Sequence, residues 1–224
     1  MTTLQSTELF AATRDGLHRV AEHVLAAAQY ADTGEISLRS VAGGFETTHP
    51  LGGNTRLSVV NTELVVIADD AGVRTAPLTT VAEAAQLVGV EPGMPAAVYP
   101  AATPLEPDAP LHVDARSARL LADWYELADA ALRRFASEIG ASPQEPILWP
   151  EHFDIGITVA SVNYGASPGD DHLAEPYLYV GPHAGPPVRD EFWNVPFGAA
   201  RTFDEIASLD EAVAFFRAGH ERHG

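Results

Sequence analysis

Two long segments of this chain place apolar residues at intervals of three and four, and the stretch after each segment changes to an alternation of two. The first segment covers residues 6–29, with Ser6 or Thr7 as its expected N-cap. The second begins at Asp114 and stops at Gly140. A period of three to four predicts an amphipathic helix, and a period of two predicts a half-buried strand. The chain is therefore expected to be an α+β protein, with antiparallel strands beside two long helices.

The alternating stretches predict an antiparallel sheet in each half. Turn residues separate them, such as Asn61-Thr62 between two strands of the first half. In the second half the two strands are expected to form one hairpin with a long tip at Gly165–Glu175. The predicted strands are Ile36–Leu38, Arg56–Val60, Leu64–Ala68, Val73–Thr75, residues 152–162 and residues 176–180.

Two short helices complete the prediction. Thr80 and Ser208 each stand three residues before a glutamate, which is the spacing of a capping box. Gly89 and Gly219 are the expected stops. The order of long helix, strands and short helix thus occurs twice. One interpretation is that the chain consists of two similar halves, and the other is that the elements alternate in this way by chance.

Six prolines between Glu91 and Asp114 interrupt both kinds of period. Proline removes a backbone donor and fixes φ, so this stretch is expected to be an extended surface connector. The predicted organisation is an N-terminal α+β half at residues 1–90, a connector at residues 91–113 and a C-terminal α+β half at residues 114–224.

Charge and composition exclude several functions. The formal net charge of -18 repels phosphate backbones and anionic lipids, so neither nucleic acid nor a membrane is an expected partner. The sequence contains no lysine and no cysteine, which excludes Schiff-base lysines, phosphate-loop lysines and thiolate chemistry. No nucleotide-binding motif is present, and the N-terminus has no signal-peptide pattern. We therefore expect a cytoplasmic protein whose candidate partners are a small-molecule ligand and a second copy of itself. Its lysine-free composition, rich in alanine and proline, is typical of a GC-rich bacterial genome.

Short motifs in a fixed order run along nearly the whole chain. The order resembles an uncharacterised bacterial family, a domain of unknown function. His152 departs from the pattern, which has a small residue there. The resemblance implies a shared fold and no known activity. The motifs are Gly44-Phe45-Glu46-Thr47-Thr48, Val81-Ala82, His112-Val113-Asp114, Phe153-Asp154-Ile155, Ser167-Pro168-Gly169-Asp170 and Glu175-Pro176-Tyr177-Leu178-Tyr179.

The densest polar stretch begins at Glu151 and carries the candidate site. If His152 and Asp154 lie on one strand, they share a face, and the following loop could bring Asp170 or His172 near them. Imidazole and carboxylate ligands suit a divalent metal, so His152, Asp154 and His172 are the possible metal ligands. The other interpretation is that Pro168–Asp171 simply forms a turn.

Aromatic residues concentrate in the same half. Tyr177 and Tyr179 alternate on one strand face and could line a groove beside Asp154. The candidate ligand-binding residues are therefore His152, Asp154, Asp170, Tyr177 and Tyr179. The predicted function is a small-molecule-binding protein or enzyme using this groove, and the alternative is a non-catalytic structural or interaction module.

Two other features of the sequence carry weaker signals. The turn His49–Gly53 is a possible oxyanion-binding loop, although a connection between strands produces the same residues. Six other histidines are expected at the surface or at helix caps. They are His23, His49, His112, His183, His220 and His223.

Overall fold

The computed structural model describes residues 7–69, 71–142 and 144–223, which form two compact units. The N-terminal unit comprises Thr2–Asp123 and Leu148–Phe153, and the C-terminal unit comprises Trp124–Ile147 and Asp154–Gly224. Helices and antiparallel strands occur in both, which confirms the α+β prediction. The proline-rich residues 91–113 contain no strand and lie wholly inside the N-terminal unit.

The first predicted helix is a continuous run of three segments. They are α1 (Thr7–Val20), a π-helical stretch η1 (Ala21–Ala26) and α2 (Ala27–Thr33). Thr7 is the first described helical residue, and Ser6 lies outside the described residues. The run ends at Gly34, whose φ of 79° is the left-handed conformation typical of a glycine stop. Its apolar stripe is buried, and the periodicity therefore located this helix correctly.

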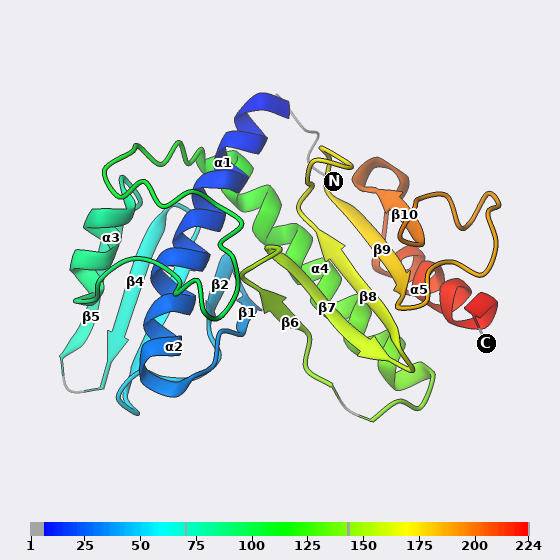
Figure 1. Ribbon diagram of the computed structural model, residues 1–224, viewed down its shortest axis with the longest axis horizontal. Helices are drawn as coiled ribbons and strands as arrows, with labels where there is room; N and C mark the ends of the chain where they lie inside the picture. Colours follow the sequence, from blue (N-terminus) through cyan, green and yellow to red (C-terminus); the bar gives the residue numbers. More distant parts are fainter. Residues whose placement is uncertain (1–6, 70, 143, 224) are drawn as a thin grey trace. The chain divides into compact units, whose positions relative to one another are not determined.

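The sheet of the N-terminal unit has the strand order β6-β1-β2-β3-β4-β5. Figure 1 shows α1 and α2 crossing this sheet, with α3 (Val81–Val88) beside β4 and β5. The side chain of Thr80 accepts a hydrogen bond from the Glu83 amide, as its capping-box spacing predicts. The strands are β1 (Leu38–Val41), β2 (Gly44–Thr47), β3 (Thr55–Val60), β4 (Glu63–Ala68), β5 (Gly72–Pro77) and β6 (Ile147–Trp149).

Strand β2 was not predicted because Gly44 had been interpreted as turn punctuation. Its missing side chain instead permits close strand pairing, since a Cβ there would lie 2.0 Å from the carbonyl oxygen of Val59. Asn61, with φ of 54°, forms the predicted turn between β3 and β4.

The C-terminal unit packs helices against the antiparallel strands β7 to β10. Helix α4 (Ala115–Glu138) enters it at Trp124, whose indole nitrogen donates to the Ser167 carbonyl at 2.9 Å. Asp114 caps this helix, as predicted, by accepting from the Ser117 amide. The remaining elements are β7 (Asp154–Val159), β8 (Val162–Ser167), β9 (Tyr177–Pro182), β10 (Ala199–Thr202), the 3-10 turn η2 (Phe203–Glu205) and α5 (Leu209–His223).

The prediction of one strand over residues 152–162 is wrong. Ala160 and Ser161, with φ of 49° and 63°, form a tight turn that divides it into β7 and β8. Strand β8 then continues to Ser167, where the tip of a hairpin had been expected. Two successive hairpins therefore replace the single long-tipped one.

Helix α5 also differs from its prediction, because Gly219 lies inside it and not at its end. A Cβ at Gly219 would lie 2.7 Å from the nearest methyl carbon of Val180, so this glycine allows close packing on β9. The order long helix, strands, shorter helix does occur twice along the chain, while a common origin of the two halves stays a prediction. Within the described ranges, no helix has both the length and the apolar character that crossing a membrane requires.

Candidate functional site

The structure does not group the predicted metal ligands. His152 is an exposed residue in a turn, and β7 begins only at Asp154. Phe153 between them has a φ of 52°, so the alternation of a strand does not apply and the predicted shared face is wrong. Among residues 7–69, 71–142 and 144–223, no three His, Asp or Glu side chains gather as a metal site would require, so the set His152, Asp154 and His172 is not assembled.

Asp170 organises the turn between β8 and β9. Its carboxylate accepts hydrogen bonds from the amides of His172 at 2.7 Å and Leu173 at 3.0 Å, and from the Tyr177 hydroxyl at 2.5 Å. These are the contacts of an aspartate that fixes its own turn. His172 itself is exposed. The geometry thus favours the turn interpretation for this part of the motif.

Tyr179 reaches Asp154 across the intervening strand. Its hydroxyl donates to the Asp154 carboxylate at 2.5 Å, although β8 separates β9 from β7. The ring crosses at Gly165, which pairs with Tyr179 in β9 and with Gly156 in β7. A Cβ at Gly165 would lie 2.5 Å from the Tyr179 hydroxyl oxygen, so only glycine leaves this path open. Tyr177 and Tyr179 thus each hold one aspartate, and this face is held together by hydrogen bonds between its own side chains.

The turn role of Asp170 predicts a specific dependence of stability on pH. Partial burial raises the pKa of Asp170, but the hydrogen bonds from Tyr177, Leu173 and His172 lower it more, leaving it below the ordinary 3.8. The native state therefore holds this proton less tightly than the unfolded state, and Asp170 stabilises the fold above pH 3.8. We expect Asp170→Asn to lower the urea midpoint at neutral pH, with the deficit shrinking as the pH falls below that value.

Asp171→Asn is the matched control, because Asp171 is the adjacent, exposed carboxylate. A deficit of Asp170→Asn that stayed constant from pH 7 to pH 3 would contradict the assignment.

A second polar cluster, which the sequence analysis missed, lies in the N-terminal unit. Glu22, in the π-helical stretch, has 0% of its surface exposed. Its Oε1 accepts from the Ala102 amide at 2.8 Å, and its Oε2 accepts from the Thr103 amide at 2.9 Å and the Thr103 hydroxyl at 2.6 Å. Every one of these donors belongs to the proline-rich residues 91–113. Glu22 therefore fastens that segment to the helix.

His23, which was expected at the surface, is only 1% exposed and binds the same segment. Its Nδ1 accepts from the Met94 amide at 3.4 Å, while its Nε2 lies 3.0 Å from the Thr103 carbonyl oxygen. A carbonyl can only accept, so Nε2 carries the proton and the ring is neutral in this arrangement. The His23 carbonyl also accepts from the Gly93 amide at 2.9 Å. Such π-helical turns are frequent at functional sites.

The turn at Trp149–Phe153 is fixed by His18 of α1. The Nε2 of His18 donates to the Pro150 carbonyl at 2.7 Å, and its ring stacks on Phe153 with centroids 5.0 Å apart. Burial lowers the pKa of His18, which keeps the imidazole neutral at physiological pH. Phe153 has a left-handed φ, which strains the backbone locally. Residues with strained backbone conformations are frequent at functional sites. Glu151 is carried by this fixed turn.

Two polar atoms of this cluster are buried without a hydrogen bond of good geometry. Among the described residues, neither the Tyr99 hydroxyl nor Glu151 Oε2 has a hydrogen bond of acceptable geometry. Burial of Tyr99, then the negative charges of Glu22 and Glu151, and last a hydrogen-bonding contact with Glu22, raise the pKa of its hydroxyl far above the ordinary value, so the phenol keeps its proton. Tyr99 therefore presents a protonated hydroxyl beside two carboxylates.

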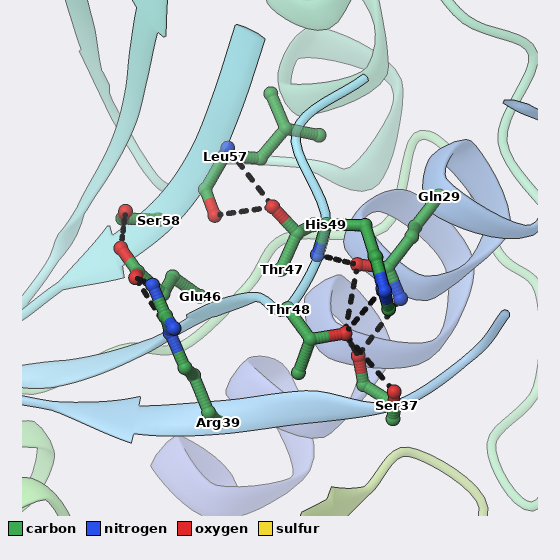
Figure 2. Close-up of polar contacts among 9 residues, drawn as sticks. All are labelled: Gln29, Ser37, Arg39, Glu46, Thr47, Thr48, His49, Leu57 and Ser58. Carbon is green, nitrogen blue, oxygen red and sulfur yellow. Dashed lines mark hydrogen bonds and ion pairs between the residues drawn. The ribbon is translucent and has the colours of Figure 1, made fainter. Parts of the chain in front are cut away.

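A neighbouring network shows how polar groups in this unit are otherwise satisfied (Figure 2). The Gln29 amide nitrogen donates to the carbonyls of Glu35 at 3.1 Å and Ser37 at 2.8 Å, and its Oε1 accepts from the Thr48 hydroxyl and the His49 amide. All the hydrogen-bonding capacity of this buried side chain is used internally. The contrast makes the unpaired atoms of Tyr99 and Glu151 notable.

The possible oxyanion loop at His49–Gly53 has no donors left to offer. The His49 amide donates to Gln29, the Gly52 amide donates to Asp32 Oδ2 at 2.9 Å, and the Gly53 amide donates to the Pro50 carbonyl at 3.3 Å. This loop is therefore a structural turn.

No family model, curated protein or solved structure matches this chain. The resemblance to an uncharacterised bacterial family, the cytoplasmic location and the expected lack of affinity for nucleic acid all stay predictions.

Proposed function

We propose that this chain is a small-molecule-binding protein whose ligand contacts Tyr99 and Glu151 in the N-terminal unit. The observation that carries the proposal is that two buried atoms, the Tyr99 hydroxyl oxygen and Glu151 Oε2, make no hydrogen bond of good geometry among the described residues. A buried polar group without a hydrogen bond costs about 1–3 kcal/mol. Proteins retain such groups where a ligand completes their hydrogen bonds.

The surroundings of the pair suit a binding site because they are rigid. His18 fixes the turn that carries Glu151, and Glu22 and His23 fix the segment that carries Tyr99. Polar groups held in place before a ligand arrives lose little conformational freedom when it binds. Tyr99 and Glu151 are both only partly buried as residues, although the Tyr99 hydroxyl oxygen and Glu151 Oε2 are themselves buried.

The alternative is a purely structural role, and the contacts favour it for two residues of the cluster, Glu22 and His23. Both are fully buried, and their polar atoms have partners in residues 91–113. We therefore assign these two residues a positioning role and assign the ligand contacts to Tyr99 and Glu151. The proposal replaces the site predicted at the β8–β9 turn, where Asp170 and Tyr177 already satisfy each other.

A fragment screen followed by two-dimensional ¹H–¹⁵N NMR tests this proposal. We expect small polar fragments to shift the backbone amides of residues 93–103 and 149–153, and we expect Glu151→Ala to abolish these shifts. The matched control is Glu106→Ala, because Glu106 is an exposed glutamate of the same segment, paired with Arg19 at 3.4 Å. Fragments that shift only amides of the C-terminal unit, or shifts that survive Glu151→Ala, would overturn the proposal.

A further inference from the structure

We propose that the edge strand β5 pairs with β5 of a second copy of this chain, so that the protein forms a homodimer with a two-fold axis. Strand β5 is the last strand of the N-terminal sheet, and no other strand of the described chain pairs with its far side (Figure 1). Each of its residues keeps part of its surface exposed. This interface is independent of the proposed ligand site and goes beyond it.

The backbone of β5 has free donors and acceptors along this edge. The Leu78 amide donates to the Thr62 carbonyl at 2.9 Å, and this pair continues the register of β4 with β5. In an antiparallel ladder, hydrogen-bonded and non-hydrogen-bonded pairs alternate. Counting back from Leu78, every second residue bonds to β4, and the residues between, Val73 and Thr75, direct their N–H and C=O groups away from the sheet. Such an edge is a template for another strand.

The free edge has clear limits, and these limits fix the register of the copy. At one end the chain enters β5 from a turn at Gly72. At the other end the Leu111 amide donates to the Thr79 carbonyl at 2.8 Å, so the proline-rich segment covers the edge from there on. The uncovered stretch 72–78 has its midpoint at Thr75. An antiparallel copy that uses the whole stretch therefore has its two-fold axis at Thr75.

This register makes the two backbones complementary. Thr75 lies opposite Thr75 of the copy, and each donates its N–H to the carbonyl of the other. Val73 lies opposite Pro77 of the copy, so its amide donates to the Pro77 carbonyl. Proline has no N–H that could be left unpaired in the seam. The pairing therefore uses every amide that β5 directs away from β4.

The side chains on the outer face also fit this register. Val73 is 64% exposed, the highest value among the large hydrophobic residues described. It pairs with Ile67 of β4, which is 40% exposed. The copy places its Pro77 beside Val73, so the three side chains form one apolar row across the seam. Pairing with the copy removes this apolar surface from water.

Charges on the inner face favour a copy of this chain as the occupant. Arg74 pairs with the buried Val66, so it lies on the covered face, where α3 packs beside β4 (Figure 1). It makes no ion pair among the described residues. In the dimer Arg74 lies opposite Ala76 of the copy, close along the strand to Thr79, whose hydroxyl donates to the exposed Glu83. Each arginine is thus directed toward a glutamate of the other chain. Strand β5 itself contains no acidic residue.

Sedimentation equilibrium of the full chain tests this interface, at about 0.15 M salt to screen the repulsion between two acidic chains. We expect the weight-average mass to rise from that of one chain toward twice that mass over about 5–500 μM protein, the range of a weak contact. Thr75→Pro removes the central donor without breaking a bond to β4, and it should raise the dimer dissociation constant about tenfold or more. Thr75→Ala keeps the N–H and is the matched control, which should dimerise like wild type.

Hydrogen exchange locates the seam. The Val73 and Thr75 amides should gain protection as the protein concentration rises, whereas the Arg74 amide, which points toward β4, should be protected at every concentration. If Thr75→Pro does not fold, Arg74→Glu takes its place. It should weaken the dimer, and adding Glu83→Arg to the same chain should restore it. A chain that stays monomeric at about 500 μM would overturn the proposal. So would a dimer that neither Thr75→Pro nor Arg74→Glu weakens, or one that leaves the Val73 and Thr75 amides unprotected.

Discussion

Replacing Glu22 with alanine is expected to lower the free energy of unfolding by about 3 kcal/mol or more. The change removes three hydrogen bonds, from the Ala102 amide, the Thr103 amide and the Thr103 hydroxyl, and each such bond contributes about 0.5–1.5 kcal/mol. It also opens a cavity under residues 91–113, because Glu22 is fully buried. Urea denaturation followed by circular dichroism measures the loss.

Glu106→Ala provides the comparison for this result. Glu106 makes an exposed ion pair with Arg19, and exposed pairs contribute about 0–1 kcal/mol. If Glu22→Ala cost no more than Glu106→Ala, Glu22 would not be fastening the proline-rich segment. Hydrogen exchange adds a local readout, since the Ala102 and Thr103 amides should lose their protection in the Glu22 variant.

Gly165→Ala is the second change with a large expected effect, about 3 kcal/mol. The added Cβ would lie 2.6 Å from the Ile155 carbonyl oxygen and 2.5 Å from the Tyr179 hydroxyl oxygen, so the Tyr179 ring must move. Overpacking of this kind costs about 1–3 kcal/mol. The displaced hydroxyl would also lose its bond to Asp154, and a hydrogen bond to a charged group contributes about 1.5–3 kcal/mol.

Gly181→Ala is the matched control, because Gly181 lies in β9 and its nearest contact to a new Cβ is an ordinary 3.7 Å. Equal destabilisation by the two substitutions would show that Tyr179 does not cross β8 at Gly165. Thermal unfolding of both variants, combined with the titration of Tyr179 by ultraviolet absorbance, separates the local rearrangement from a general loss of strand propensity.

Periodicity and capping chemistry predicted the helices well because these signals are local. The capping glutamates after Thr80 and Ser208 and the glycine stop at Gly89 depend on residues within one turn of each helix end, whereas the stop predicted at Gly219 is wrong. The strand errors arise from glycines and turns whose role depends on distant residues. Gly44 is typical of a turn in the sequence, and only its close approach to β3 shows why a strand needs a glycine there. Ala160-Ser161 contains neither the Asn nor the Gly that tight turns prefer, so the sequence gives no signal for that turn.

The candidate site was only partly predictable for a related reason. The sequence shows a stretch dense in polar residues from Glu151, and a turn at Pro168–Asp171 is one of the two interpretations it allows. Glu22 and His23, in contrast, sit on a helix whose expected apolar stripe excludes them, and a π-helical turn has no simple sequence signal. Their partners Ala102 and Thr103 lie 80 and 81 residues away from Glu22. Short alanine and threonine runs in a proline-rich segment give no sign of such a contact.

The stability of Tyr99→Phe without any added ligand tests the central claim most directly. The proposed site requires that the Tyr99 hydroxyl contribute little to the fold, since it lies near the Glu22 carboxylate but makes no hydrogen bond of good geometry among the described residues. Removing a buried, unpaired hydroxyl is nearly neutral or stabilising, whereas Tyr177→Phe removes a bond to the Asp170 carboxylate and should cost about 1.5–3 kcal/mol. We therefore expect the urea midpoint of Tyr99→Phe to equal or exceed that of wild type, with Tyr177→Phe clearly lower. A loss for Tyr99→Phe as large as that for Tyr177→Phe would mean that the Tyr99 hydroxyl is structural, and it would contradict the ligand site.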